Sequence, residues 1–344
     1  MKKTFLALLL LVSLLLTGCG GTVADDTSED APETATYPVQ YRVDGEIFQT
    51  VEIEAGQIAP YLTPEPKENT LFDGWYLDEA CTNPFHFTTK ITAPLTLYAG
   101  FTVDAAALIN RITTVVIRSV VQVKVTHYKT SFFGFKREEE HYIGSGVIFS
   151  ISEEGDRAYL LTNCHVAEVK SGKDGADYTI VDYLGREYTG NLYKNANGKR
   201  AISPEYDLAC LWFADPDEKL ETVEYAAGDA EIGDQVVSLG YPEGQSNAVT
   251  FGRVTGMPTI SLVDGEAYLS NVTFPVTGHT AVIDGGSSGG PLVNANLQLV
   301  GVNYAGEKSD DDFHKGYAIP LSKVWEFLED FVYVDQPGAA KPVG

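Results

Sequence analysis

The stretch that most restricts the fold of this chain is residues 284–292, which read Asp-Gly-Gly-Ser-Ser-Gly-Gly-Pro-Leu. Glycine adopts backbone conformations that other residues avoid, so this run can curl tightly. In such a turn the amides of Gly286 and Ser288 can point at one spot and form an oxyanion hole. The sequence therefore predicts that Ser288 is a nucleophile presented on a sharp turn.

Two other segments supply the partners that a nucleophilic serine needs. His165 lies just after the apolar run at 158–161, and Asp207 comes directly before the apolar run at 208–211. A serine hydroxyl is inert until a base removes its proton, and histidine titrates near neutrality. A buried carboxylate can hold the imidazole in the required tautomer. The residue types and their order along the chain predict a triad of His165, Asp207 and Ser288.

Composition narrows the fold class and the partners. The chain has 344 residues, of which 44% are hydrophobic, enough for a sizeable core and two domains. Apolar runs are short and rich in Val, Ile, Tyr and Thr, which favours a mostly β protein. The net charge of −24 argues against nucleic acid and anionic lipid as electrostatic partners. No metal-ligand spacing and no phosphate loop is visible, so we expect no cofactor and no metal site.

Residues 1–19 have the pattern of a targeting segment. Met1-Lys2-Lys3 is basic, Phe5 to Leu16 is a short apolar run, and Leu16-Thr17-Gly18-Cys19 follows. The segment resembles a bacterial lipoprotein signal, which implies a lipidated Cys19 and a membrane-anchored location on the extracellular face. An ordinary secretory signal that happens to contain a cysteine is the alternative.

The rest of the chain divides by composition. Residues 20–36 are acidic, small and free of aromatics, which predicts a disordered linker. We expect a small β module at 37–103, a larger β domain at 104–336, and a flexible tail at 337–344.

The remaining cysteines are Cys81, Cys164 and Cys210, and an odd number cannot pair fully. Cys164 and Cys210 lie in apolar, strand-like context, which predicts buried free thiols. Because neighbours on a strand point to opposite faces, we do not expect Cys164 and His165 to form a catalytic pair.

The module at 37–103 contains alternating strand patterns and three characteristic segments. These are Leu71-Phe72-Asp73-Gly74-Trp75-Tyr76, Ala80-Cys81-Thr82-Asn83-Pro84-Phe85 and Leu95-Thr96-Leu97-Tyr98-Ala99-Gly100-Phe101. They resemble one internalin-type B repeat, also called the Listeria–Bacteroides repeat. The resemblance implies a β-grasp-like module of surface proteins, with a spacer role or a cell-surface partner. We interpret Trp75 and Tyr76 as core aromatics rather than a binding patch. The module is expected to fold independently and to be dispensable for hydrolysis.

The domain at 104–336 begins with a short helix that Asp104 can cap, and continues as short strands with a polar hairpin or loop at 129–140. A late helix is predicted at 321–331, because Val324, Phe327, Leu328 and Phe331 share a face.

Seven blocks of this domain identify the family that it resembles. In chain order they are Gly144-Ser145-Gly146-Val147-Ile148, Leu161-Thr162-Asn163-Cys164-His165-Val166, Asp207-Leu208-Ala209-Cys210-Leu211, Gly240-Tyr241-Pro242-Glu243-Gly244, Gly286-Ser287-Ser288-Gly289-Gly290-Pro291-Leu292, Val300-Gly301-Val302-Asn303 and Gly316-Tyr317-Ala318-Ile319-Pro320. Together they resemble the trypsin-like domain of the HtrA/DegP family, from about residue 118 to about residue 335. The resemblance implies two perpendicular six-stranded β-barrels with the active site between them. It also implies that His165 is the general base, Asp207 its orienting group and Ser288 the nucleophile, with an oxyanion hole at Gly286 and Ser288.

Two departures from the family pattern stand out. We expect no PDZ domain after the helix at 321–331, which puts family-style oligomeric control in doubt. Family members usually carry Asn-Pro-Gly-Asn before the serine, where this chain has Asp284-Gly285-Gly286-Ser287. Gly285 in place of proline is expected to loosen the turn that sets the oxyanion amides.

The primary substrate pocket can be partly predicted. Val282 occupies the position that lines the pocket base in this fold, which favours small or medium aliphatic side chains. The strand at Asn303-Tyr304-Ala305-Gly306 is placed to pair with the substrate backbone. His279 and Thr280 keep open a glutamyl endopeptidase specificity, which needs a His with Thr or Ser.

These features predict a surface-anchored serine endopeptidase that cleaves unfolded or surface proteins. The alternative from another class is an adhesion or binding lipoprotein with an inactive protease fold.

Overall fold

The computed structural model describes residues 35–67, 69–242, 248–260, 272–308 and 314–333. Every element below belongs to one compact unit, Thr36–Gly344. The signal, Cys19, residues 20–34 of the predicted linker and the tail lie outside the described residues, and the predictions for them stay predictions. β1 begins at Thr36, the last residue of the predicted linker.

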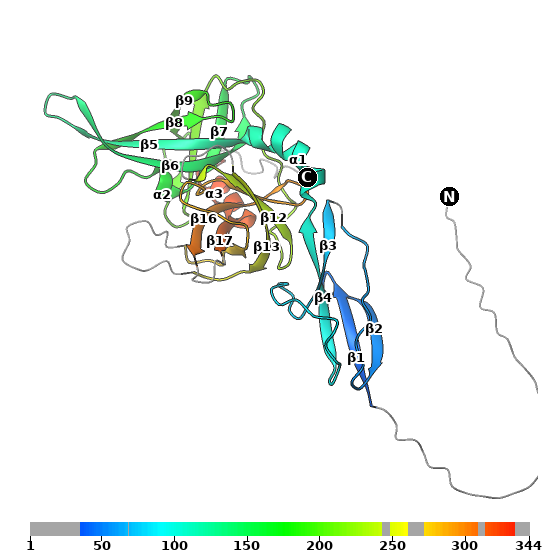
Figure 1. Cartoon of the computed structure of the whole chain (residues 1–344). Coiled ribbons are helices and arrows are strands. Elements are labelled where there is room, and N and C mark those ends of the chain that lie inside the picture. Colours follow the sequence, from blue (N-terminus) through cyan, green and yellow to red (C-terminus); the bar gives the residue numbers. More distant parts are fainter. Residues whose placement is uncertain (1–34, 68, 243–247, 261–271, 309–313, 334–344) are drawn as a thin grey trace, which may run out of the picture. The chain divides into compact units, whose positions relative to one another are not determined.

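The N-terminal module is a four-stranded mixed sheet (Figure 1). Its strands are β1 (Thr36–Val43), β2 (Glu46–Glu54), β3 (Thr70–Tyr76) and β4 (Leu95–Val103), in the order β2-β1-β4-β3. β1 and β4 run parallel, and the other pairs are antiparallel. Trp75 is 2% exposed in an apolar core and its ring meets Tyr41 edge-on, as expected of a core aromatic. The same prediction is wrong for Tyr76, which lies outside this core with its ring against Arg253.

A short helix joins the module to the larger domain. Asp104 caps α1 (Ala105–Thr114), because its carboxylate accepts the Ala107 amide at 3.0 Å, as the sequence predicts. A single 3₁₀ turn (Val116–Ser119) follows, and the first strand of the larger domain begins directly after it.

The first barrel is built from antiparallel neighbours. Its elements are β5 (Val120–Thr130), β6 (Lys136–Ile151), β7 (Arg157–Thr162), α2 (Cys164–Ala167), β8 (Gly175–Val181), β9 (Glu187–Leu192), β10 (Ile202–Ser203) and β11 (Leu208–Ala214). The sheet order is β10-β11-β7-β6-β5-β8-β9, and a further pairing of β11 with β9 closes six strands into a barrel. The hairpin expected at 129–140 is the turn between β5 and β6.

The second barrel closes in the order β12-β13-β14-β17-β16-β15. Its strands are β12 (Gln235–Gly240), β13 (Ala248–Gly256), β14 (Thr277–His279), β15 (Pro291–Asn294), β16 (Leu299–Lys308) and β17 (His314–Pro320). The helix α3 (Leu321–Phe331) follows with the predicted bounds and buries Val324, Phe327 and Leu328. The mostly β fold with two six-stranded barrels is confirmed.

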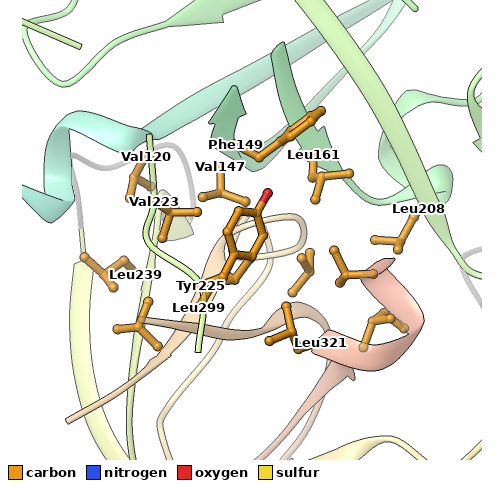
Figure 2. Close-up of a cluster of buried hydrophobic side chains, with 14 of the residues drawn as sticks. Val120, Val147, Phe149, Leu161, Leu208, Val223, Tyr225, Leu239, Leu299 and Leu321 are labelled. Atoms are coloured by element: carbon orange, nitrogen blue, oxygen red, sulfur yellow. The ribbon is translucent and has the colours of Figure 1, made fainter. Parts of the chain in front are cut away.

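One hydrophobic core joins the two barrels. Figure 2 shows Tyr225 between Val147 and Leu161 of the first barrel and Leu299 of the second, in one cluster that also contains Leu239 of β12 and Leu321 of α3. Burying such side chains contributes roughly 25 cal/mol per Å² of apolar surface, so the core holds the barrels in one fixed arrangement. The catalytic candidates therefore lie on two barrels that share one hydrophobic core.

No helix in the described ranges is long and apolar enough to cross a membrane.

Candidate active site

His165 and Asp207 form a hydrogen-bonded pair on the first barrel. Strand β7 ends at Thr162, and His165 lies in the single turn of α2 that follows. Asp207 Oδ2 accepts from His165 Nδ1 at 2.8 Å, and Asp207 Oδ1 accepts from the His165 main-chain amide at 3.0 Å. The carboxylate thus holds both the ring and the backbone of one residue.

Asp207 is held firmly at the start of β11. It is 1% exposed, and its carbonyl accepts from the side chain of Asn163 at 2.9 Å. Its backbone adopts φ of 50°, a left-handed conformation that costs a non-glycine residue some free energy. The left-handed conformation turns the chain just before β11 so that the carboxylate faces His165.

Cys164 and His165 lie on a helical turn, not on a strand as the sequence pattern suggested. Asn163 has extended backbone and ends the strand, after which the chain turns at once into α2. Cys164 is nevertheless buried, and burial raises the pKa of its thiol, with the nearby Asp207 adding to the shift. The thiol stays protonated. Cys164 and Cys210 are free and buried as predicted, and Cys81 is also free and buried.

Ser288 lies on the second barrel, in the turn between β14 and β15. Its hydroxyl donates to the Tyr304 carbonyl at 3.4 Å. Within the described residues no hydrogen bond joins Ser288 Oγ to His165, so the hydroxyl must rotate toward the ring before proton transfer. Rotation about one side-chain bond is a small rearrangement.

The turn around Ser288 is made by glycines for steric reasons. Gly286 and Gly289 have φ of 99° and 90°. A Cβ on Gly289 would lie 2.1 Å from the Ser145 carbonyl oxygen, and one on Gly290 would lie 2.2 Å from the Leu239 carbonyl oxygen. The amides of Gly286 and Ser288 donate to no acceptor in the described part of the chain, which leaves both available to an oxyanion.

Ser145, at the start of the buried part of β6, ties this turn to the first barrel. Its amide donates to the Ser288 carbonyl at 2.7 Å, and its hydroxyl donates to the Gly286 carbonyl at 2.7 Å. The same hydroxyl accepts from the Tyr241 amide at 2.9 Å. No role is predicted for Ser145 from the sequence, although its position between Gly144 and Gly146 in a strand could have indicated a close backbone approach.

The predicted pocket residues differ in what they contact. Val282 is 38% exposed, and its carbonyl accepts from the Thr250 hydroxyl. Asn303 is fully buried, and its side-chain amide donates to Ser238 and to the Pro291 carbonyl, inside the barrel. Tyr304 is buried, and its carbonyl accepts the hydrogen bond from Ser288 Oγ. Ala305 follows in the same strand.

His279 lies at the end of β14, opposite Gly316 of β17. A Cβ on Gly316 would come 2.2 Å from the imidazole, so the glycine leaves the space that the ring fills. Burial lowers the pKa of His279 to about 4, against smaller opposing contributions from the Ala281 backbone and the Asn303 side chain. The ring is therefore neutral at pH 7. Thr280 follows and bonds to Arg253 of β13.

The part of the chain that the structure describes contains no cluster of three or more His, Cys, Asp or Glu side chains that could hold a metal ion.

Comparison with known protein families agrees with this geometry. Residues 144–302 match the family model of the trypsin-like peptidase domain, and residues 37–100 match that of the Listeria–Bacteroides repeat domain. The expected resemblances for both regions are confirmed.

Two characterised relatives and one solved structure show the extent of the similarity. The serine protease Do-like HtrB of Bacillus subtilis is 31% identical over 199 residues, covering 56% of this chain and 40% of the relative. The periplasmic serine endoprotease DegP of Escherichia coli is 30% identical over 206 residues, covering 59% and 38%. The active form of the Rv3671c protease from M. tuberculosis is 25% identical, with a TM-score of 0.48, covering 70% of this chain and 90% of that one. The chain thus spans about two fifths of the length of the curated relatives.

Proposed function

Because this chain carries a trypsin-like peptidase domain homologous to HtrA and DegP behind a Listeria–Bacteroides repeat domain, we propose that it is a serine endopeptidase. The observation that carries the proposal is the buried Asp207 carboxylate, which accepts from both nitrogens that fix His165, its ring Nδ1 and its amide. With the proton on Nδ1, the other ring nitrogen is free to act as a base.

The reaction follows from the positions of these groups. His165 takes the proton of Ser288 as its oxygen attacks the peptide carbonyl, and later gives that proton to the leaving amine. The unbonded amides of Gly286 and Ser288 stabilise the oxygen that becomes negative. Asp207 stays ionised and stabilises the imidazolium that forms. Water then hydrolyses the acyl-enzyme with His165 again as base.

The β16 edge beside Ser288 is suited to a substrate in extended conformation. β15 pairs with β16 only as far as Pro291–Val302, so from Asn303 onward β16 has β17 as its one partner strand among the described residues. Tyr304 lies at an irregularity of the β16–β17 pairing. A substrate strand added along Tyr304, Ala305 and Gly306 would place its scissile carbonyl near Ser288.

The primary pocket is proposed to be apolar. Ile283 packs against the position where Gly306 would carry a Cβ, at 3.1 Å, and Val282 precedes it. His279 is neutral at pH 7 and so offers no positive charge to a glutamate side chain. Peptides with Val, Ala or Leu before the scissile bond should be cleaved faster than those with Glu or Arg, by about 1–3 kcal/mol for each poorly matched group. A clear preference for Glu in a peptide library would favour the glutamyl specificity instead.

The decisive experiment for the activity is labelling by a fluorophosphonate probe, which reacts only with an activated serine. The wild-type chain should be labelled, and Ser288→Ala should not be. If the folded wild-type chain remains unlabelled and cleaves no denatured protein, the result would favour the alternative hypothesis of a binding lipoprotein with an inactive protease fold.

We also propose that the protein is anchored at the outer face of the cell membrane through lipid on Cys19, and acts on unfolded or surface proteins there. The support is the sequence at 16–19 and the envelope location in the names of relatives such as periplasmic DegP. Cys19→Ser should release the protein from the membrane fraction or leave it as an uncleaved precursor. Unchanged detergent partitioning and unchanged mature mass in that variant would refute the anchor.

A further inference from the structure

Arg253 of β13 extends from the second barrel into the N-terminal module. Its side chain is 12% exposed, and Nη2 lies 2.7 Å from Asp73 Oδ2. The same nitrogen donates to the Phe101 carbonyl at 3.3 Å, and Nη1 donates to the Cys81 carbonyl at 3.5 Å. The guanidinium also lies over the Tyr76 ring, 5.1 Å from its centre. The module thus surrounds one arginine of the peptidase domain with a carboxylate, two carbonyls and an aromatic face.

The module is shaped to receive this group. Asp73 also accepts from the Tyr76 hydroxyl, which fixes the carboxylate and the ring relative to each other. A Cβ on Gly100 would lie 2.2 Å from the Tyr76 ring and 3.1 Å from Arg253 Nη1, so the glycine leaves room for both. The planar fork of arginine can bond to several oxygens at once, which lysine cannot do in the same geometry.

The backbone of Arg253 contacts a different part of the molecule. Its amide donates to Thr280 Oγ1 at 3.0 Å, and its carbonyl accepts from the Thr280 amide at 3.0 Å. Close by, the Thr250 hydroxyl donates to the Val282 carbonyl at 2.8 Å, and a Cβ on Gly252 would lie 2.1 Å from the Ala281 amide. This part of β13 is therefore the support on which residues 280–282 rest.

Residues 280–282 lead directly to the catalytic turn. Ile283 comes next and packs against Gly306 of β16. The turn then begins, with the Ser287 amide donating to the Asp284 carbonyl at 2.9 Å, and Ser288 follows. A shift of β13 at Arg253 would reach the pocket wall and the oxyanion amides through a short stretch of chain.

We propose that Arg253 is a positioning residue. Held by Asp73 of the repeat module, it keeps β13 in place, and β13 in turn holds residues 280–283 as one wall of the primary pocket. This inference rests on the proposed endopeptidase function. It opposes the sequence-based expectation that residues 37–103 are dispensable for hydrolysis.

The test uses the whole chain with Asp73→Asn, Arg253→Gln and the double variant. The control is Asp44→Asn, because the ion pair of Asp44 with Lys67 lies within the module and is half exposed. Three quantities are measured: kcat and KM on peptides that differ before the scissile bond, the rate of fluorophosphonate labelling, and hydrogen exchange of the segment 278–290. Melting temperature reports stability separately.

Asp73→Asn and Arg253→Gln should each lower kcat/KM on the best peptide by ~2- to 30-fold, the range of coupling through packed networks. KM should rise by a larger factor than kcat falls. The ratio of kcat/KM between the best and the poorest peptides should become smaller. The segment 278–290 should exchange faster, and the double variant should be little worse than either single one. Asp44→Asn should match wild type.

Wild-type peptide preference and wild-type exchange at 278–290 in both single variants would overturn the proposal, even if the melting temperature falls. Should Arg253→Gln fail to fold, Asp73→Asn decides, because it changes only the module side. If the wild type proves to have no peptidase activity, the endopeptidase function fails, while the exchange measurement still decides whether Arg253 positions the segment.

Discussion

The N-terminal module and the peptidase domain differ most in what they bury. The module has an aromatic and aliphatic core around Tyr41, Trp75 and Leu97. Apart from its aromatic residues, Thr70 is the one buried polar side chain in the described part of 36–103. The peptidase domain buries many more polar side chains, among them Ser145, Asn163, Asp207 and Asn303.

The difference shows where this fold places its chemistry. A buried polar group costs free energy unless it is hydrogen-bonded, so each one must be held by partners in a defined geometry. In the module, buried polar atoms bond to carbonyls of the module itself, as when Trp75 Nε1 donates to the Leu62 carbonyl. In the peptidase domain, buried Asn163 bonds to Asp207 and buried Ser145 bonds to the Ser288 turn. Groups held rigidly in a low-dielectric environment are what transition-state stabilisation requires.

The largest effect should come from removing the reacting groups themselves. Ser288→Ala and His165→Ala should each lower kcat by about 10⁶-fold, and the double variant by little more, because the residues act as one unit. Melting temperature should change little, since neither side chain fills the core. Additive losses in turnover of a denatured protein would mean that the two residues do not act together.

Asp207→Asn should lower kcat by about 10⁴-fold, because an amide cannot hold the proton of His165 on Nδ1. The backbone bonds that hold the loop remain, so the fold should be kept. The measurement is the pH profile of kcat/KM together with circular dichroism. An asparagine variant with near-normal turnover would show that the buried pair is structural and not part of the reaction.

Much of this arrangement is predictable because it depends on local patterns. The apolar face formed by Val324, Phe327 and Leu328 is enough to predict the helix α3. The residue types around His165, Asp207 and Ser288 are enough to predict these three residues as the triad. Local patterns do not show that β7 ends before Cys164, which puts His165 on a helical turn. At that boundary the Asn163 side chain donates to the carbonyl of Asp207, a residue distant in the sequence.

Two further features that sequence reasoning missed are contacts between distant segments. Ser145 bonds to Gly286 and Ser288 across the two barrels, and Arg253 bonds to Asp73 in another domain. No periodicity or spacing in the sequence predicts that such residues contact each other. The orientation of the Ser288 hydroxyl toward Tyr304 is likewise set by three-dimensional packing alone.

Trp75→Ala tests whether the module contributes stability rather than chemistry. Truncating a buried aromatic should destabilise the module by about 3–5 kcal/mol, because it leaves a cavity that the sheet cannot close. The hydrogen bonds of His165, Asp207 and Ser288 all lie outside the module, so fluorophosphonate labelling should persist, at a reduced rate. Denaturant unfolding followed by far-ultraviolet circular dichroism measures the loss. Complete loss of labelling with the peptidase domain still folded would contradict the division of roles.

The peptidase domain should be the acid-sensitive part of the molecule. The pKa of His279 is lowered to about 4 by burial, from an ordinary value of 6.5. As the pH falls below 6.5, His279 becomes protonated in the unfolded chain, whereas in the native state it stays neutral until about pH 4. The free energy of unfolding therefore decreases across this window, by about 3 kcal/mol in total. Well above pH 6.5 the ring is neutral in both states and no longer changes stability with pH.

Urea unfolding at several pH values measures the slope, and His279→Gln is the matched variant because it cannot titrate. Its stability should depend less on pH between 4 and 6.5 than that of the wild type. Parallel slopes for the two proteins would mean that other groups cause the acid sensitivity.

The smallest effects are expected from removing one buried hydroxyl from the module and one from the peptidase domain. Tyr41 is fully buried and donates to the Pro60 carbonyl in the module, whereas Ser145 donates to Gly286 and accepts from Tyr241 in the peptidase domain. Tyr41→Phe should cost about 1 kcal/mol of stability and leave kcat/KM unchanged, since it removes one ordinary hydrogen bond. Ser145→Ala should cost about 1–3 kcal/mol, because the partly buried Gly286 carbonyl loses its donor. It should also lower kcat, because the oxyanion amides lose their fixed direction. Both variants are measured by urea unfolding and by steady-state kinetics on the same peptide. If Ser145→Ala changed stability alone, or Tyr41→Phe changed kcat, buried polarity in the two regions would not differ in kind, and the catalytic turn would depend on its glycines rather than on the bond from the first barrel.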